Sequence, residues 1–174
     1  ITHHAGQYPG SVSQTTRDIW KNSLIRSDDN GLTVGVVYTF NDQLFREKIC
    51  MTQPNTIYTV VGLANNSLQK TNDGGVSWTD ITPSTSVTGA SVRNISDIAV
   101  SDVNPNEIWV TYSGVQNTCK VLHSTDGGVN YTNLTDPILT DYPITKIVFQ
   151  RGTDGGVYVG NSTGIYYRNN SMSN

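Results

Sequence analysis

The sequence predicts an all-β protein that is built from repeated sheets of four antiparallel strands, and three observations lead to this prediction. Asn, Thr and Ser are abundant while only 14% of the residues are charged, a composition that favours strands and turns over helices. Runs of β-branched and aromatic residues are separated by short segments rich in Gly, Pro, Asn and Asp. One turn motif recurs from position 27 to 71 to 124, at intervals of 44 and 53 residues. This is the period of β-propeller blades or of a comparable array.

The recurring motif is clearest at 71–78, which reads Thr-Asn-Asp-Gly-Gly-Val-Ser-Trp. Asp followed by Gly-Gly between two β-rich runs indicates a tight hairpin turn, because Gly takes positive φ values and the carboxylate bonds the amides of its own turn. The motif repeats at 124–131 with Tyr as the closing aromatic, and in degraded form at 27–34, where Val replaces the aromatic. The residues that we expect to have this structural role are Ser27, Asp29, Gly31, Thr71, Asp73, Gly75, Trp78, Ser124, Asp126, Gly128 and Tyr131.

The pattern Ser/Thr-x-Asp-x-Gly-x-x-aromatic resembles the Asp-box, or BNR-like repeat, of sialidases, xyloglucanase-type glycoside hydrolases and the sortilin/Vps10 family. It is similar to the Asp-box propeller repeats of large secreted and cell-surface bacterial proteins, and the resemblance covers most of residues 23–170. It implies propeller blades of four antiparallel strands with Asp-box hairpins, in a protein that is secreted or displayed at the cell surface. The motif contains no evident catalytic group.

The chain divides into an irregular N-terminal arm at 1–22 and a propeller segment at 23–174. We expect a partial blade at 23–40, full blades at 44–82 and 94–135, and a partial blade at 144–170. Within a blade the strands are named A to D from the axis outward, with the motif in the C–D turn. The expected strands are 23–27, 33–40, 45–51, 57–63, 68–70, 76–81, 95–100, 107–112, 119–124, 129–134, 144–150, 157–160 and 165–168.

The strand count predicts an open structure. The first repeat supplies only strands C and D, and the last supplies A to C, so the ends do not pair into one complete blade. We therefore expect an incomplete arc of a larger propeller, with the remaining blades supplied by the same or another chain. Because the chain opens on Ile1, we expect a mature or excised segment of a longer protein.

Composition excludes several partners. The net charge of −3 and the low charge content argue against nucleic acid and anionic membrane surfaces, both of which need a basic patch. No apolar run is long enough to span a bilayer, so we expect no membrane insertion. No metal-ligand spacing, phosphate loop or CxxC is present, and we expect no metal and no cofactor. Cys50 and Cys119 are interpreted as two buried residues on different strands, with a disulfide as the alternative.

A ligand site is expected on the face opposite the Asp-box turns, where the longer loops 83–94, 113–118 and 136–143 gather. The expected ligand is a glycan or a protein surface, because Asn, Ser, Thr and Tyr side chains are available while convergent ionisable groups are few. Asp136 and Asp141 are the only paired carboxylates that could imitate the acid/base pair of a glycosidase. A role in ordinary turns explains both residues better. Tyr142 is the best stacking residue, with a rim position covering the blade core as the alternative. The expected ligand-binding residues are Arg93, Asn117, Asp141 and Tyr142.

Two functions remain open. The first is a non-catalytic secreted or cell-surface propeller segment that acts in binding, adhesion or display. The second is part of a carbohydrate-active enzyme, a glycoside hydrolase or a sialidase-like protein, whose catalytic residues lie outside this segment. The arginine triad, Tyr nucleophile and Glu partner of sialidases have no matching motifs here. The lack of a persuasive acid/base pair favours the first function, and no catalytic residue is predicted.

Overall fold

The computed structural model describes residues 22–63, 66–89, 94–115, 119–139 and 142–172. Nearly all of the expected arm at 1–22 therefore lies outside the described residues. The helical elements described are the one-turn helix α2 (Thr85–Thr88) and the 3-10 helix η1 (Pro137–Leu139). The strands are β1 (Ser23–Arg26), β2 (Gly35–Thr39), β3 (Leu44–Cys50), β4 (Gln53–Val61), β5 (Ser67–Thr71), β6 (Thr79–Asp80), β7 (Ile95–Val100), β8 (Ile108–Tyr112), β9 (Val121–Ser124), β10 (Thr132–Asn133), β11 (Lys146–Phe149), β12 (Val157–Gly160) and β13 (Ile165–Arg168).

These strands form antiparallel sheets in simple chain order. The sheets are β1-β2, β3-β4-β5-β6, β7-β8-β9-β10 and β11-β12-β13. Each pair of neighbours in a sheet is antiparallel and consecutive in sequence, as in a meander. The expected fold class, four-stranded antiparallel propeller blades, is confirmed.

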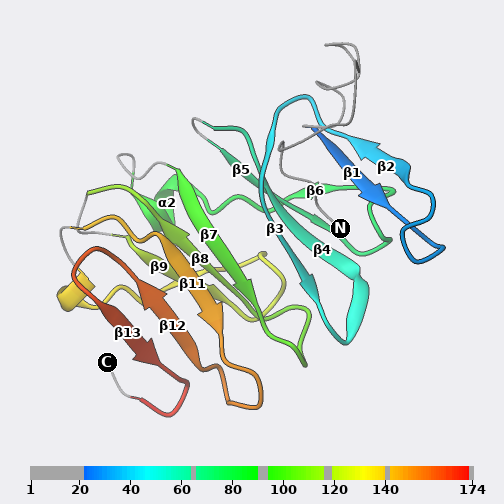
Figure 1. Cartoon of the computed structure of the whole chain (residues 1–174). Helices are drawn as coiled ribbons and strands as arrows, with labels where there is room; N and C mark the ends of the chain where they lie inside the picture. Colours follow the sequence, from blue (N-terminus) through cyan, green and yellow to red (C-terminus); the bar gives the residue numbers. More distant parts are fainter. Residues whose placement is uncertain (1–21, 64–65, 90–93, 116–118, 140–141, 173–174) are drawn as a thin grey trace.

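The sheets stand side by side, and the three larger ones have their first strands together (Figure 1). Strand β7 lies between β3 and β11, and the outer strands spread away from this inner row. In the described residues the sheets do not close into a ring, since β1-β2 and β11-β12-β13 lie at opposite ends of the row (Figure 1). The molecule is therefore an arc, as expected from the strand count.

Apolar clusters hold the neighbouring sheets together. One cluster joins the β3–β6 sheet to the β7–β10 sheet and includes Tyr58, Leu68 and Ile98, all almost fully buried. A second joins the β7–β10 sheet to β11-β12-β13 and includes Trp109 and Ile147. Because fully burying one large apolar side chain stabilises a protein by roughly 1.5–3 kcal/mol, these interfaces account for much of the stability of the arc.

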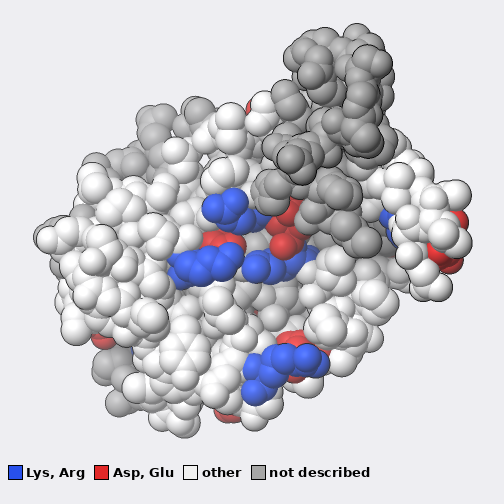
Figure 2. Space-filling view, in the orientation of Figure 1, with Lys and Arg blue, Asp and Glu red and all other residues white. Residues whose placement is uncertain are grey.

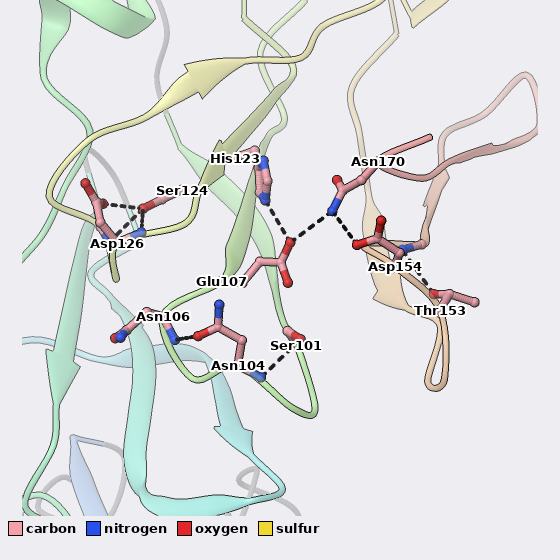
Figure 3. A network of polar contacts seen from close by, with 12 residues as sticks. Ser101, Asn104, Asn106, Glu107, His123, Ser124, Asp126, Thr153, Asp154 and Asn170 are labelled. Atoms are coloured by element: carbon pink, nitrogen blue, oxygen red, sulfur yellow. Dashed lines mark hydrogen bonds and ion pairs between the residues drawn. The ribbon is translucent and has the colours of Figure 1, made fainter. Parts of the chain in front are cut away.

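A polar network adds to the second interface on the side of the tight turns (Figure 3). A side-chain oxygen of Glu107 lies 3.3 Å from Nε2 of His123 and 3.5 Å from the side-chain amide nitrogen (Nδ2) of Asn170. This Nδ2 group also donates to the Asp154 carboxylate at 3.0 Å. The contact with His123, and more weakly that with Asn170, lowers the pKa of Glu107 although burial opposes the shift. The network ties the turn after β13 to the sheet beside it.

Some strand bounds differ from the sequence-based expectation. The outer strands β6 and β10 have two residues each, whereas 76–81 and 129–134 were expected. Val76 and Val129 explain the difference, because both lie in the turn with 72% and 77% of their surface exposed. Strand β4 begins at Gln53 rather than at 57, since a register shift at Cys50 lets the backbone pair through the expected turn.

Candidate ligand-binding site on the inner strands

The three recurring turns are closed by their own side chains. In the turn after β5, Oγ1 of Thr71 donates to Asp73 at 2.6 Å and accepts the Gly75 amide at 3.0 Å. The Asp73 carboxylate accepts the Ser77 amide at 3.0 Å and the Ser77 hydroxyl at 2.5 Å. These bonds favour the charged form, led by those from Ser77, and they hold the pKa of Asp73 well below its usual range.

The other two turns repeat this arrangement. Asp29 accepts the Thr33 amide at 2.8 Å, and Asp126 accepts the Asn130 amide at 2.9 Å. In both turns the leading hydroxyl, from Ser27 or Ser124, bonds the carboxylate at 2.8 Å. Hydrogen bonds from residue 33 or residue 130 are the main cause that lowers the pKa of each Asp to about 2. These carboxylates are engaged in holding their turns.

The closing aromatics and glycines fasten each turn to the body of the arc. Trp78 Nε1 donates to the Gly75 carbonyl at 3.0 Å, and its rings pack edge-on against Phe40 of the preceding sheet. The Tyr131 hydroxyl donates at 2.8 Å to the carbonyl of Ile81, also in the preceding sheet. Trp78 and Tyr131 are half-buried. The turns therefore serve the fold, and they offer little that could bind a ligand.

The loop site expected from the sequence is largely outside the described residues. Arg93, Asn117 and Asp141 lie outside the described residues. Tyr142 is 50% exposed. Asp136 accepts the Ile138 amide at 2.8 Å at the start of η1, which is turn chemistry rather than an acid/base arrangement. The loop site stays a prediction.

The inner strands carry a charged cluster that the sequence reasoning missed. We define the inner-strand cluster as Arg46 and Lys48 of β3, Asp97 of β7 and Lys146 of β11. Figure 2 shows basic and acidic side chains gathered at the centre of the face over these three strands. Asp97 is fully buried, and its carboxylate accepts the Lys146 ammonium at 2.9 Å and the Ile147 amide at 3.1 Å. The Arg46 Nε lies 3.8 Å from the other oxygen.

Three of the cluster residues occupy equivalent places in consecutive sheets. Arg46, Asp97 and Lys146 are 51 and 49 residues apart, and each lies near the start of an inner strand. Stacking the sheets therefore brings one residue from each repeat to the same height beside the axis. The signal available in the sequence was Asp97 itself, a charged residue inside the otherwise uncharged strand 95–100.

The cluster has more positive charge than its buried carboxylate neutralises. Lys48 has its pKa lowered, first by burial and further by the neighbouring charges of Lys146 and Arg46, while Asp97 and Glu47 oppose the shift. Arg46 is oriented by its own strand: Nη1 donates to the Phe45 carbonyl at 2.9 Å and the guanidinium carbon lies 4.2 Å from the centre of the Phe45 ring. The Lys146 side chain remains 55% exposed. Arg46 and Lys48 of β3 and Lys146 of β11 therefore form a positively charged surface along the inner strands.

Hollows lie on either side of this cluster. One of 190 Å³ is lined by Lys48, by the ion pair of Arg151 with Asp102, and by the exposed apolar residues Ile49, Met51 and Val148. The other, of 270 Å³, lies beside Arg46 and is lined by the polar residues Asn66, Asn94, Ser96, Ser113 and Thr145 together with the apolar residues Phe45, Leu63, Ile95 and Ile144. The surface therefore offers cations, an apolar patch and amide or hydroxyl groups within one row.

The described residues contain no group of three or more His, Cys, Asp or Glu that could hold a metal ion. None of their helices has the length and apolar character needed to cross a membrane. Cys50 and Cys119 are buried free thiols, so the disulfide alternative is wrong for this structure.

No protein-family model and no curated protein matches this chain. Solved structures of β-propellers are similar in fold. An ancestral GH74 enzyme superposes with a TM-score of 0.60 at 18% identity, over 84% of this chain and 20% of that one. The GH74 enzyme of Niastella koreensis gives 0.59 at 16% identity, over 84% and 25%. The YCF48 protein of Cyanidioschyzon merolae gives 0.56 at 23% identity, over 76% and 38%. The chain spans about a fifth to two fifths of these proteins, and such identities show the fold alone.

Proposed function

We propose that this chain is a non-catalytic segment of a larger propeller in a secreted or cell-surface protein, and that its inner strands bind an acidic segment of a partner protein. The observation that carries the proposal is the excess of cations in the inner-strand cluster of a chain whose net charge is −3. The secreted or surface location rests on the Asp-box resemblance of the three turns.

Electrostatics favours an anionic ligand at this place. The cluster holds three cations against the buried Asp97, and Glu47 contributes a second negative charge. One positive charge remains in excess. Burial, and to a lesser extent repulsion from Lys146 and Arg46, lowers the pKa of Lys48, and a bound carboxylate would offset this repulsion by adding a negative charge beside the ammonium group.

The surroundings favour a peptide over a glycan. Beside Lys48 lie Ile49 and Met51, which are 50% and 65% exposed. An acidic side chain followed by an apolar one would meet the cation and this patch together. One structure of similar fold is a YCF48 protein bound to D1 peptide, which shows that a propeller of this kind can hold a peptide. At 21% identity it says nothing of the residues involved.

The carboxylates support a non-catalytic role. Asp18 and Asp141 lie outside the described residues, and every other Asp and Glu has a hydrogen-bond or charged partner within the chain. A glycosidase acid needs a raised pKa, whereas the resolved carboxyl pKa shifts are downward. The lowered groups are Asp29, Asp73, Glu107 and Asp126.

The test measures binding of a labelled decamer of Glu with one central Leu, by fluorescence anisotropy at two salt concentrations. Lys48→Gln should weaken binding roughly fivefold, near the upper end for a single ion pair at a surface, and added salt should weaken it further. The matched control is Lys70→Gln, since Lys70 lies on β5 and its ammonium bonds Asn106. Peptide binding that is insensitive to Lys48→Gln and to salt would refute the proposal. Stronger binding of an oligogalacturonate would replace the peptide with a glycan.

A further inference from the structure

The middle strand of each three- or four-stranded sheet carries an aromatic residue at an equivalent place. These residues are Tyr58 of β4, Trp109 of β8 and Tyr158 of β12, which are 51 and 49 residues apart. Each pairs with one residue of the inner strand and one of the next strand outward: Lys48 and Lys70 for the first, Ala99 and His123 for the second, Val148 and Tyr167 for the third. The three positions are therefore structurally comparable.

In the first two sheets this aromatic contacts the sheet that follows. Tyr58 has none of its surface exposed, and its hydroxyl donates at 2.7 Å to the carbonyl of Pro105, in the turn between β7 and β8. Trp109 is 1% exposed and stacks on Phe149 of β11, with ring centres 5.5 Å apart. In both cases a group of the next inner strand, or of the turn after it, covers the ring.

In the last sheet the equivalent ring is uncovered. Tyr158 is 40% exposed, and its neighbours on the same sheet face are exposed as well: Val148 by 49%, Tyr167 by 37% and Ile165 by 78%. Alternation along the strands places these side chains opposite Ile147, Val157 and Val159, which pack against the preceding sheet. The Tyr158 and Tyr167 rings lie 4.9 Å apart, as the Trp109 and His123 rings do at 4.8 Å.

A backbone bond shows that the three strands of the last sheet are equivalent to the first three strands of the other two. The Gly74 amide donates to the Asn55 carbonyl at 3.0 Å, and the Gly127 amide donates to that of Asn106 at 2.8 Å. In the last sheet the backbone amide of Asn170 donates to the backbone carbonyl of Asp154 at 3.1 Å. In the last two sheets the bond joins the turn after the third strand to the turn between the first two, and in the first sheet it reaches Asn55 near the start of β4. Asn169 thus stands where the other turns have Asp, and its side-chain oxygen accepts the Ser171 amide at 3.1 Å.

We propose that the face of β11-β12-β13 formed by Val148, Tyr158, Ile165 and Tyr167 is the docking surface for one further blade of the same repeat type, an inference that rests on the larger propeller of the proposed function. The chemistry of the partner follows from the two interfaces already present. It presents an apolar or aromatic side chain from its inner strand to Tyr158, and a turn carbonyl within reach of the Tyr158 hydroxyl. The proposed face continues the row of interfaces in the same direction, which is why a blade rather than an unrelated partner is expected.

The test supplies such a blade from the chain's own sequence. Because Asn169 is equivalent to Asp126, an extended protein is made in which residues 1–168 are followed by a second copy of residues 126–172. In the original chain Tyr158→Ser should shift the thermal unfolding midpoint by no more than about 2 °C, as for an ordinary surface position. In the extended protein the same substitution should lower the midpoint by at least about 6 °C, as for loss of a buried aromatic.

The extended protein contains its own control. Tyr158→Ser in the second copy, whose face is again the last of the row, should behave as it does in the original chain. The conservative variant Tyr158→Phe keeps the ring and should retain most of the midpoint while removing the hydroxyl bond. An extended protein that unfolds at or below the midpoint of the original chain, or in which Tyr158→Ser has the same effect in both copies, would overturn the proposal. So would a concentration-dependent dimer of the original chain that Tyr158→Ser abolishes, because the face would then serve a second copy of this chain.

Discussion

Replacing Gly75 by Ala tests how the tight turns are fitted against the neighbouring sheet. Gly75 has a φ of +103°, and a Cβ at this position would lie 2.5 Å from Cδ2 of Leu24 and 3.1 Å from Cγ1 of Val37. The equivalent Gly31 has a φ of +91° but no atom within 4 Å of its Cβ position. The pair separates the cost of the backbone conformation from the cost of the clash.

The magnitudes follow from these two terms. An Ala held in the left-handed region costs about 1–2 kcal/mol, and that is the whole expected loss of unfolding free energy for Gly31→Ala. Overpacking a buried contact adds about 1–3 kcal/mol, since Leu24 is itself buried and cannot swing into solvent. Gly75→Ala should therefore lose about 2–5 kcal/mol.

Thermal unfolding followed by far-ultraviolet circular dichroism measures both variants. For a domain of this size the midpoint should fall by about 2–8 °C for Gly31→Ala and by about 4–20 °C for Gly75→Ala. Equal shifts for the two variants would refute the reasoning, because the clash with the neighbouring sheet would then have no cost.

Three further outcomes are expected. The turn carboxylates Asp29 and Asp126 have folded-state pKa values near 2, below the ordinary 3.8, so their stabilisation is complete above pH 5 and is lost as the pH falls toward 2. Acid titration of the unfolding midpoint should show this loss, and Asp126→Asn should flatten part of it. Trp109→Ala removes the ring between the last two sheets and should cost about 3–5 kcal/mol in urea unfolding, whereas a cost below 1 kcal/mol would contradict the packing described. Burial raises the pKa of Cys119 to about 11, so native protein at pH 8 should resist iodoacetamide at this residue and react only after unfolding, as peptide mapping would show.

The turns could be predicted from the sequence because their chemistry is local. Thr71, Asp73 and Gly75 lie within five residues, and the bonds that close the turn join just these residues and Ser77. The count of strands per repeat was likewise readable from alternating strand and turn segments. The lengths of the outer strands were not, since Val76 and Val129 have strand propensity but are placed in solvent by the turn geometry.

The inner-strand cluster could not be predicted in this way. Arg46, Asp97 and Lys146 are about 50 residues apart, and they meet because sheet packing brings equivalent positions to one height. Paired charges within one loop can be recognised in the sequence, whereas these three residues lie on three separate strands. The loop site was predicted from residues in loops that were expected to share one face. Three of its four residues lie outside the described part of the chain.

The sign of charge at these equivalent positions also bears on how the chain assembles. Repeats with similar strands risk packing in the wrong order, because each apolar face is broadly compatible with every other. At the equivalent position of the three inner strands, the residues in chain order are positive, negative and positive: Arg46, Asp97 and Lys146. If the third sheet took the place of the second, Lys146 would lie beside Arg46 with no carboxylate between them, and Asp97 would be left at an end. The alternating charges therefore favour one packing order among sheets whose apolar faces are otherwise similar.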